Sequence, residues 1–377
     1  MRRPFFKIWE PGIRILANGG QQHNTKPDGY TPQQIKNAYG ISAVRGDGSG
    51  QTIAIVDAYG NPTMEADLNT FSRQFNLPQT NAFQFRVINA GAAPNPNDKS
   101  ANSWMVETCL DVEWVHAIAP KANIILVVAK SDANADLDAA VDAAVNANPK
   151  PEIISMSFGG PEPKSASAAA VSDRHYNVPG VLFVASSGDN GAGVSYPASS
   201  PYVISVGGTT LPLDANGNLT GPEVAWSGSG GGVSAVETVP SFQNRAQNTG
   251  KRTVPDVSYD ADSATGFAIY FTNPFRVSKG SNTGSISGWF RVGGTSAGAP
   301  QWAGLLALMN SQRSISSSAV QNGLYSLASA APGTYFRDIT QGSDGAAPQD
   351  QARSGYDFVT GLGSPLAANL LSALERM

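Results

Sequence analysis

The sequence is poor in cysteine and in charge. Its 377 residues include a single cysteine, Cys109, so no disulfide can form within the chain. Charged residues make up 14%, well below the roughly 25% of an average soluble domain. A low charge density limits self-repulsion when carboxylates gain protons, so we expect the protein to tolerate acid.

Long apolar stretches and basic runs are also missing. No segment approaches the roughly 20 apolar residues of a membrane span, so we expect no membrane association. The net charge of −4 and the lack of any Lys/Arg cluster argue against nucleic acid as a partner. The first residues, MRRPFFKIWEPGIRIL, begin with a pair of arginines but contain no apolar core long enough for a signal peptide. An exported protein would need a targeting segment of another kind, or one outside this sequence.

Apolar runs alternate with helical patterns along most of the chain. After an irregular leader over residues 1–28, buried strands are predicted at 52–58, 123–129, 152–160, 180–189 and 202–208. Helices are predicted at 64–75, 135–148, 165–177, 297–310, 317–329 and 365–376. Residues 208–295, rich in Gly, Ser, Thr and Asn, are predicted to form long surface loops. Continuous apolar strands separated by helices favour one α/β domain over 29–377, with a mostly parallel central sheet covered on both faces.

A candidate nucleophile lies in GGTSAGAP, residues 293–300, directly before an apolar helical pattern. The glycines permit a sharp turn and Pro300 suits a first helical turn, which places Ser296 at or next to a helix N-terminus. Unpaired N–H groups and the positive end of the helix dipole favour developing negative charge there, as acyl transfer requires. A serine that only caps the helix is the commoner source of such a pattern.

Two acids, Glu107 and Asp111, are four residues apart in the predicted helix of SWMVETCLDVEW, so both face one side of it. A shared proton would relieve their repulsion, and burial would raise the pKa of one of them. Two solvated surface acids are the ordinary alternative, but the apolar residues around them indicate a buried helix. A carboxylate is a weaker base than imidazole, so such a pair suits acidic pH.

The histidines offer no better base. A site that resembles those of subtilisins would need a histidine in a His-Gly-Thr-His setting, and none of His23, His116 and His175 lies in a Gly-rich loop of that kind. Asp57 ends a predicted strand, where we expect either a turn residue or a carboxylate that supports Glu107.

Asp189 lies in the Gly-flanked loop SSGDNGAG, directly after a predicted strand. A carboxyl group can donate a hydrogen bond to an oxyanion only when it is protonated, which again points to acidic pH. The alternatives are a simple turn residue at Asp189, or the neighbouring Asn190 as the donor.

Together these motifs resemble those of the sedolisin family of serine-carboxyl peptidases. GGTSAGAP is similar to the nucleophile motif that sedolisins share with subtilisins, and the E-x-x-x-L-D spacing is similar to the sedolisin acid pair. The resemblance runs from about residue 29 to the C-terminus. It implies that Ser296 is the nucleophile, Glu107 the general base, Asp111 the residue that orients it, and Asp189 the oxyanion donor.

The same resemblance implies a subtilisin-like three-layer fold and a secreted, monomeric endopeptidase that acts on proteins or peptides in acid. It also implies one structural Ca²⁺ ion, held by segments 336–342 and 354–365. The implied ligands are the carboxylates of Asp338 and Asp357 and the backbone carbonyls of Ile339, Arg353 and Gly355. Sedolisins often have Gly in place of Arg353, which matters little where only the carbonyl binds. A pair of turn aspartates is the alternative.

Three other functions remain open from the sequence. One is a tripeptidyl-peptidase of the same family, and another is a catalytically silent peptide-binding homologue, which would lack a nucleophile or base. The third is a histidine-based subtilisin that uses Asp57 and His116. Sedolisins are usually made with a large propeptide that aids folding and blocks the cleft. The sequence has little ahead of the domain opening at Gly29, so a propeptide would be lost, removed or outside this sequence.

Overall fold

The computed structural model describes residues 1–8, 21–81, 84–91, 93, 95, 98–279, 282–310 and 317–377. An eight-stranded sheet crosses the molecule in the order β11-β10-β9-β7-β4-β6-β5, and β14 also pairs with β10. Every pairing in it is parallel except that of β10 with β11, which confirms the mostly parallel sheet. In sheet order the strands are Val224–Ala225, Val203–Thr210, Leu182–Ser186, Ile153–Met156, Thr52–Ala58, Asn123–Ala129 and Phe85–Ala90, with β14 at Val257–Asp260.

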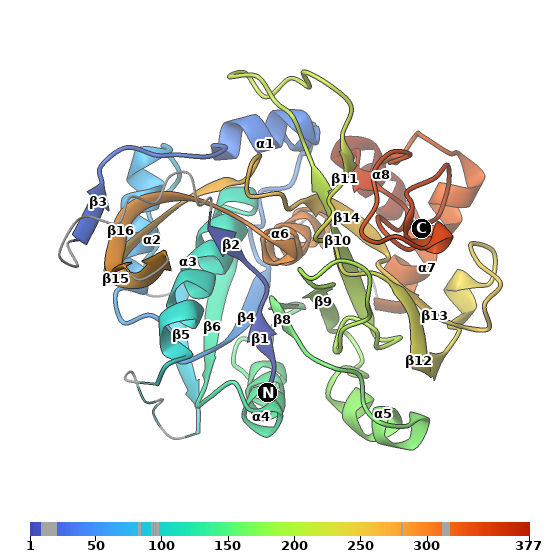
Figure 1. The fold of residues 1–377 in the computed structure, drawn as a ribbon, viewed down its shortest axis with the longest axis horizontal. Coiled ribbons are helices and arrows are strands. Elements are labelled where there is room, and N and C mark those ends of the chain that lie inside the picture. The colour runs from blue at the N-terminus through green and yellow to red at the C-terminus, as the bar shows by residue number, and fades with distance from the viewer. Residues whose placement is uncertain are drawn as a thin grey trace.

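Both faces of this sheet are covered, as the unbroken apolar runs predicted (Figure 1). In β4, Ile53 and Ile55 belong to one buried cluster, whereas Ala54 and Val56 belong to another on the opposite face. The first cluster includes side chains of α2, α3, α6 and α8, and the second includes those of α4. These helices span Met64–Gln74, Ala101–Ile118, Gly298–Asn310, Ala367–Leu374 and Asn134–Val145.

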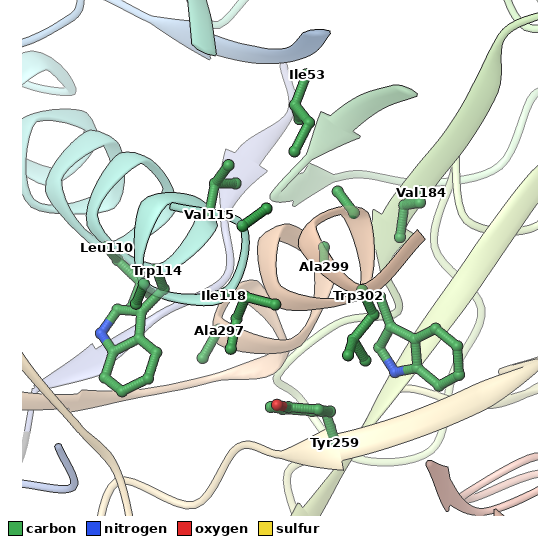
Figure 2. Packing of buried hydrophobic residues seen from close by; sticks show 14 of the residues in the cluster. Ile53, Leu110, Trp114, Val115, Ile118, Val184, Tyr259, Ala297, Ala299 and Trp302 are labelled. Carbon is green, nitrogen blue, oxygen red and sulfur yellow. The ribbon is translucent and has the colours of Figure 1, made fainter. Parts of the chain in front are cut away.

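Helices α3 and α6 pack closely against each other beside the sheet. Figure 2 shows Val115 and Ile118 of α3 directed toward α6, with Ile53 of β4 above them, whereas Trp302 projects from the other side of α6. A Cβ atom added at Gly304 of α6 would lie 2.8 Å from Cβ of Ile118, so only glycine permits this approach. The contact fixes the positions of two helices that carry, or immediately follow, the candidate catalytic residues.

Residues 208–295 differ from the long loops that we predicted. They contain β11, β14, β12 (Gly232–Thr238) and β13 (Lys251–Val254), and a long hairpin of β15 (Phe267–Lys279) and β16 (Asn282–Gly293). The hairpin register shifts between Phe271 and Phe275, where Asn273-Pro274 interrupts the alternation of side chains. Ladder hydrogen bonds hold these residues in extended conformation, both between neighbouring strands of the region and with β10 of the central sheet.

The predicted leader also differs from an irregular segment in its described parts. β1 (Arg3–Pro4) pairs antiparallel with β8 (Phe158–Gly159), and β2 (Lys7–Ile8) pairs with the end of β16. β3 (Gln21–Asn24) runs parallel to β16. Residues 9–20 lie outside the described residues, and the boundary at residue 28 stays a prediction. The extended form arises because partners far along the sequence satisfy the backbone groups.

The remaining helices lie close to their predicted places. α5 (Ala166–Ser172) is shorter than predicted and passes into a 3-10 turn, whereas α7 (Ser317–Ala330) matches. α1 (Pro32–Ala38) was not predicted; it begins with a capping box, in which the side chains of Thr31 and Gln34 each accept from the backbone N–H of the other. A short pair, β17 (Phe336–Arg337) with β18 (Ser364–Pro365), closes the C-terminal region. Among the residues described, no helix combines the length and apolar character needed to cross a membrane.

Candidate active site

Ser296 lies where the sequence placed it, in a short turn between a strand and a helix. Strand β16 ends at Gly293, Thr295–Ala297 form one 3-10 turn, and α6 starts directly after it. The residue is fully buried, and its Oγ donates to the carbonyl oxygen of Ser157 at 3.2 Å. Its backbone N–H points away from the helix and donates to the carbonyl oxygen of Phe5 at 3.0 Å.

The N-terminal segment of the chain occupies the cleft above Ser296. Its backbone runs antiparallel to Phe158–Gly159, and the Phe5 N–H approaches both the Ser157 carbonyl, at 3.3 Å, and the Ser296 Oγ, at 3.0 Å. The buried Phe5 ring lies against Gly159, where an added Cβ would come within 2.7 Å of it. Residues 3–5 therefore lie as an extended peptide whose last carbonyl accepts from the backbone N–H of Ser296, the candidate nucleophile.

Glu107 projects from α3 into the same buried region. Burial, together with the charges of Asp111 and Asp57, raises the pKa of Glu107 well above its usual range. The nearby Ser296 hydroxyl acts in the opposite direction by favouring the ionised form. Within the part of the chain that the structure describes, neither Glu107 oxygen has a hydrogen bond of ordinary length. The carboxyl thus lies beside the Ser296 hydroxyl.

Two more buried acids adjoin Glu107. Asp111 accepts a hydrogen bond from the Ser157 hydroxyl at 2.8 Å, and burial beside Asp57 raises its pKa well above its usual range. Asp57 lies within β4, one residue before its end, and burial raises its pKa to about 7, although the Thr108 hydroxyl lowers it in part. Like charges so close in a low-dielectric site cannot all ionise, so this cluster retains protons in the folded protein.

Asp189 faces Ser296 from the loop after β9. Its Oδ1 accepts from the backbone N–H and the hydroxyl of Thr295, both at 2.8 Å, whereas the buried Oδ2 has no partner among the described residues. Burial outweighs these bonds and the charges of Lys7 and Arg3, and raises the pKa of Asp189 to about 6. A protonated Oδ2 is a hydrogen-bond donor without an acceptor.

Gly294 brings the donor and the carbonyl together. Its φ of 105° is one that side chains with a Cβ rarely adopt. A Cβ there would lie 2.3 Å from the Phe5 carbonyl oxygen and 2.5 Å from Oδ2 of Asp189. Both oxygens therefore lie against the same face of Gly294, and a larger residue would occupy the space between them. The alternative donor, Asn190, is exposed and lines the outer cleft.

The histidines are engaged elsewhere. Nε2 of His116 lies 2.8 Å from the Pro78 carbonyl, and burial lowers the pKa of this imidazole to about 4. His23 contacts Ser287, and His175 contacts Asp142. No described hydrogen bond joins any of the three to Ser296. The expected carboxylates gather around the serine instead.

Known proteins share this arrangement of elements. The family model of the subtilases matches residues 87–363. Kumamolisin from Bacillus sp. (strain MN-32) is 33% identical over 405 residues, which cover 99% of this chain and 68% of kumamolisin. The chain belongs to the sedolisin family. The solved structure of Pseudomonas sedolisin, a serine-carboxyl proteinase complexed with pseudo-iodotyrostatin, is 26% identical with a TM-score of 0.75, over 93% of this chain and 99% of that one.

The sedolisin family, and with it the subtilisin-like fold and the class of serine-type peptidases, is thereby shown. A tripeptidyl-peptidase 1 from Dictyostelium discoideum is 29% identical over 359 residues. That alignment covers 84% of this chain. The chain spans about two thirds of the length of kumamolisin and about half of that tripeptidyl-peptidase.

Two residues of this sedolisin site escaped the analysis of the sequence. The Ser157 hydroxyl donates to the side chain of Asp111 and to the carbonyl oxygen of Ser296, at 2.8 and 3.2 Å. Thr295, directly before the nucleophile, holds Asp189 and also accepts from the Gly188 N–H at 3.1 Å. The only local signal for Thr295 is its place in the GTS motif, and Ser157 has none.

The two predicted calcium-binding loops of this sedolisin lie side by side. The Asp338 carboxylate accepts from the Gly355 N–H at 3.0 and 3.2 Å, so the loops are in contact. Asp357 is buried and accepts from the N–H groups of Arg353, Val359 and Thr360. No described hydrogen bond reaches the carbonyl oxygens of Ile339, Arg353 or Gly355. Among the described residues no group of three or more acidic, His or Cys side chains is arranged to hold a metal.

Proposed function

We propose that this chain is an endopeptidase that cleaves proteins or peptides at acidic pH through an acyl-enzyme on Ser296. The position of the Phe5 carbonyl carries this proposal. This carbonyl accepts from the Ser296 N–H at 3.0 Å and lies, like Oδ2 of Asp189, against Gly294. The carbonyl of a cleaved bond would occupy the same position. Binding at that point orients the carbonyl for attack by Oγ.

Glu107 and Asp111 are proposed to move the proton. When two buried carboxyls share one proton, one oxygen remains free to take the hydroxyl proton of Ser296 as its Oγ attacks the carbonyl carbon. Glu107 then returns the proton to the leaving amine, and the same residue activates the water that releases the acyl group. Asp111, held by Ser157, fixes the orientation of Glu107.

Asp189 is proposed to donate the second hydrogen bond to the oxyanion. Its pKa of about 6 means that the carboxyl is protonated in acid and can donate. As pH rises through 6 it becomes an anion that repels the oxyanion, so activity falls on the alkaline side. An amide in its place would donate at every pH.

The path of the N-terminal segment favours endopeptidase over tripeptidyl-peptidase action. Arg2, the fourth residue before the Phe5–Phe6 bond, donates its N–H to the Asp132 carbonyl at 3.0 Å, so the cleft accommodates a peptide beyond its third residue. Release of tripeptides requires a cleft that is blocked at that point. Phe6 to Ile8 continue on the other side of the bond, where β2 pairs with β16.

We also propose that the two C-terminal loops hold one Ca²⁺ ion. Asp338 and Asp357 would supply carboxylate oxygens, and Ile339, Arg353 and Gly355 would supply carbonyls, a hard oxygen set that suits this ion. The three carbonyls have no described hydrogen bond, which supports the fit. The ion would neutralise the carboxylates and hold the loops together.

The acidic working range bears on where the protein acts. Because the donor at Asp189 functions below about pH 6, we propose that the enzyme is secreted into an acidic medium. We also propose that it acts as a monomer.

The acyl-enzyme is the step to test. Wild type and Ser296→Ala are first incubated at pH 4 with an internally quenched peptide, which reports cleavage. Each protein is then incubated with an activated ester substrate, the reaction is stopped with acid, and the protein is analysed by mass spectrometry for an acyl adduct. We expect cleavage inside the peptide and an acyl adduct on the tryptic fragment that contains Ser296, both absent from the variant. Release of only tripeptides from free N-termini would favour the tripeptidyl-peptidase, and no adduct from the folded protein would overturn the mechanism.

A further inference from the structure

The side chain of Arg2 fills a pocket of its own beside the cleft. Along the bound segment Arg3 pairs with Gly159, so its neighbours Arg2 and Pro4 project to the other side of this strand. Arg2 is 4% exposed, whereas Arg3 is exposed to solvent. Of these two adjacent arginines, Arg2 has a buried side chain and Arg3 an exposed one.

One carboxylate meets the buried guanidinium. Asp138, on α4, accepts from Nη1 of Arg2 at 2.6 Å, and its side chain is 19% exposed. A charge-assisted hydrogen bond of this length, sheltered from water, is stronger than one on an open surface. The N-terminus accordingly lies beside α4 in Figure 1.

Aromatic rings complete the walls of the pocket. The Arg2 guanidinium carbon lies 5.7 Å from the centre of the Phe158 ring and 5.6 Å from that of Tyr196, within the range of cation–π attraction. Both rings, with Tyr176, belong to the buried cluster on the α4 face of the sheet. Tyr196 is fixed further by its hydroxyl, which donates to Asp173 at 2.9 Å. The fold therefore holds the walls in place by contacts that do not involve Arg2.

This combination discriminates between side chains. A planar guanidinium satisfies the carboxylate and lies against the rings, whereas a neutral side chain would leave Asp138 half-buried without its cation. An acidic side chain would add repulsion. A lysine would keep the charge but offers a poorer fit to planar partners.

We propose that Asp138, Phe158 and Tyr196 form a specificity subsite for arginine at the fourth residue before the cleaved bond. The inference rests on the proposed peptidase function, because Arg2 takes that position only if the Phe5 carbonyl marks the bond that is attacked. The substrates preferred by this enzyme would then carry arginine at that position, which the chain's own N-terminal segment displays.

The kinetic test uses quenched peptides built on Arg-Arg-Pro-Phe-Phe-Lys, with Arg, Lys, Met or Glu at the fourth position before the bond. Wild type should prefer Arg over Met by about tenfold or more in kcat/KM, because the charge-assisted hydrogen bond to Asp138 stabilises only the arginine substrate. The Asp138→Asn variant should reduce that ratio to within about twofold. Asp142→Asn, a matched change on the same helix at a residue that contacts His175, should keep it. The same exchange at the third position should change the rate little, since Arg3 is exposed.

A second measurement separates failure of the pocket from failure of the catalytic proposal. In the Ser296→Ala chain, which cannot cleave itself, amide hydrogen exchange of residues 2–8 reports how firmly the segment is held. Asp138→Asn or Arg2→Met should accelerate exchange severalfold, and Asp142→Asn or Arg3→Met should not. Equal exchange in all variants would overturn the pocket whether or not peptides are cleaved. Accelerated exchange without an arginine preference in cleavage would confine the contact to the chain's own segment and overturn the specificity.

Discussion

Two groups of buried carboxylates in this protein differ in how they are satisfied. Asp256 accepts from both terminal nitrogens of buried Arg252 at 2.6 and 2.5 Å, and from the Tyr325 hydroxyl and the Ser205 N–H. Glu107 is equally buried, yet none of the described residues makes a hydrogen bond of ordinary length to it, and its nearest charges are negative. The first carboxylate stabilises the fold, and the second is held in an unfavourable environment at the site of chemistry.

The difference shows which buried acid is available to react. A carboxylate whose oxygens all accept hydrogen bonds and face a cation is a poor base, because its charged form is already stabilised. A carboxyl surrounded by other acids has a raised pKa and binds a proton more readily, which is why we propose Glu107 as the base for the Ser296 hydroxyl. Folding free energy from the rest of the core offsets the cost of that cluster.

Glu107→Gln should have the largest effect and should separate activity from stability. The amide cannot take the proton of Ser296, so we expect hydrolysis at pH 4 to fall by about 10²–10⁴-fold. The free energy of unfolding at neutral pH should stay the same or rise, because a buried acid is removed. Peptide hydrolysis and urea denaturation of the same samples measure both. A variant that is strongly destabilised would place Glu107 with Asp256 as a structural acid.

Asp256→Ala should give the opposite pattern. It leaves the Arg252 guanidinium buried without its anion, so we expect a loss of about 3–5 kcal/mol of stability. The specific activity of the molecules that remain folded should be near that of wild type. Asp47→Ala is the control, because its ion pair with Lys121 is exposed and should contribute less than about 1 kcal/mol. Equal losses of stability in Asp256→Ala and Asp47→Ala would contradict the structural role assigned to Asp256.

The pH dependence of stability should reveal the acid cluster. The folded-state pKa of Asp57 is about 7, above its ordinary value of 3.8, so its contribution is fully present below about pH 4 and is lost as pH rises through 7. The melting temperature of wild type should therefore decline between pH 4 and pH 7. Asp57→Asn should flatten the decline when both proteins are followed by calorimetry. An equally steep decline in the variant would assign the effect to other acids.

Calcium removal should have the smallest effect on stability. It tests a third kind of carboxylate, one that would bind a metal ion. If Asp338 and Asp357 hold Ca²⁺, saturating ion should stabilise the chain by about 1–3 kcal/mol, reversibly on chelation. Asp357→Asn should abolish the shift in melting temperature that calcium produces. Asp214→Asn, at an exposed loop carboxylate that also accepts backbone N–H groups, should keep it. A shift that persists in Asp357→Asn would place the ion elsewhere.

The sequence predicted the parts of this structure that depend on local patterns. Strands β4 and β6 begin and end at the predicted residues, because an unbroken apolar run specifies burial on both faces. The four candidate catalytic residues could also be predicted, because each lies in a short sequence motif. The structure brings them into one site: Ser296, Glu107, Asp111 and Asp189. Their roles remain predictions until activity is measured.

The parts that escaped prediction depend on distant partners. The hairpin of β15 and β16 is an exception, because its strands are neighbours in the sequence; we missed its apolar run Phe267–Phe271 within a region rich in Gly, Ser, Thr and Asn. The N-terminal segment lacks any pattern of its own, since it takes an extended form by pairing with β8 and by the contact of Arg2 with Asp138, 136 residues away. Such contacts have no local signature in a single sequence.

The most direct test of the account is the rate of hydrolysis of an unfolded protein from pH 3 to pH 8, for wild type beside Ser296→Ala and Glu107→Gln. Activity in wild type that is confined to acid, declines as pH rises through about 6 and is lost in both variants is what a serine activated by buried carboxylates predicts. Activity that peaks above neutrality and is unaffected by Glu107→Gln would contradict it.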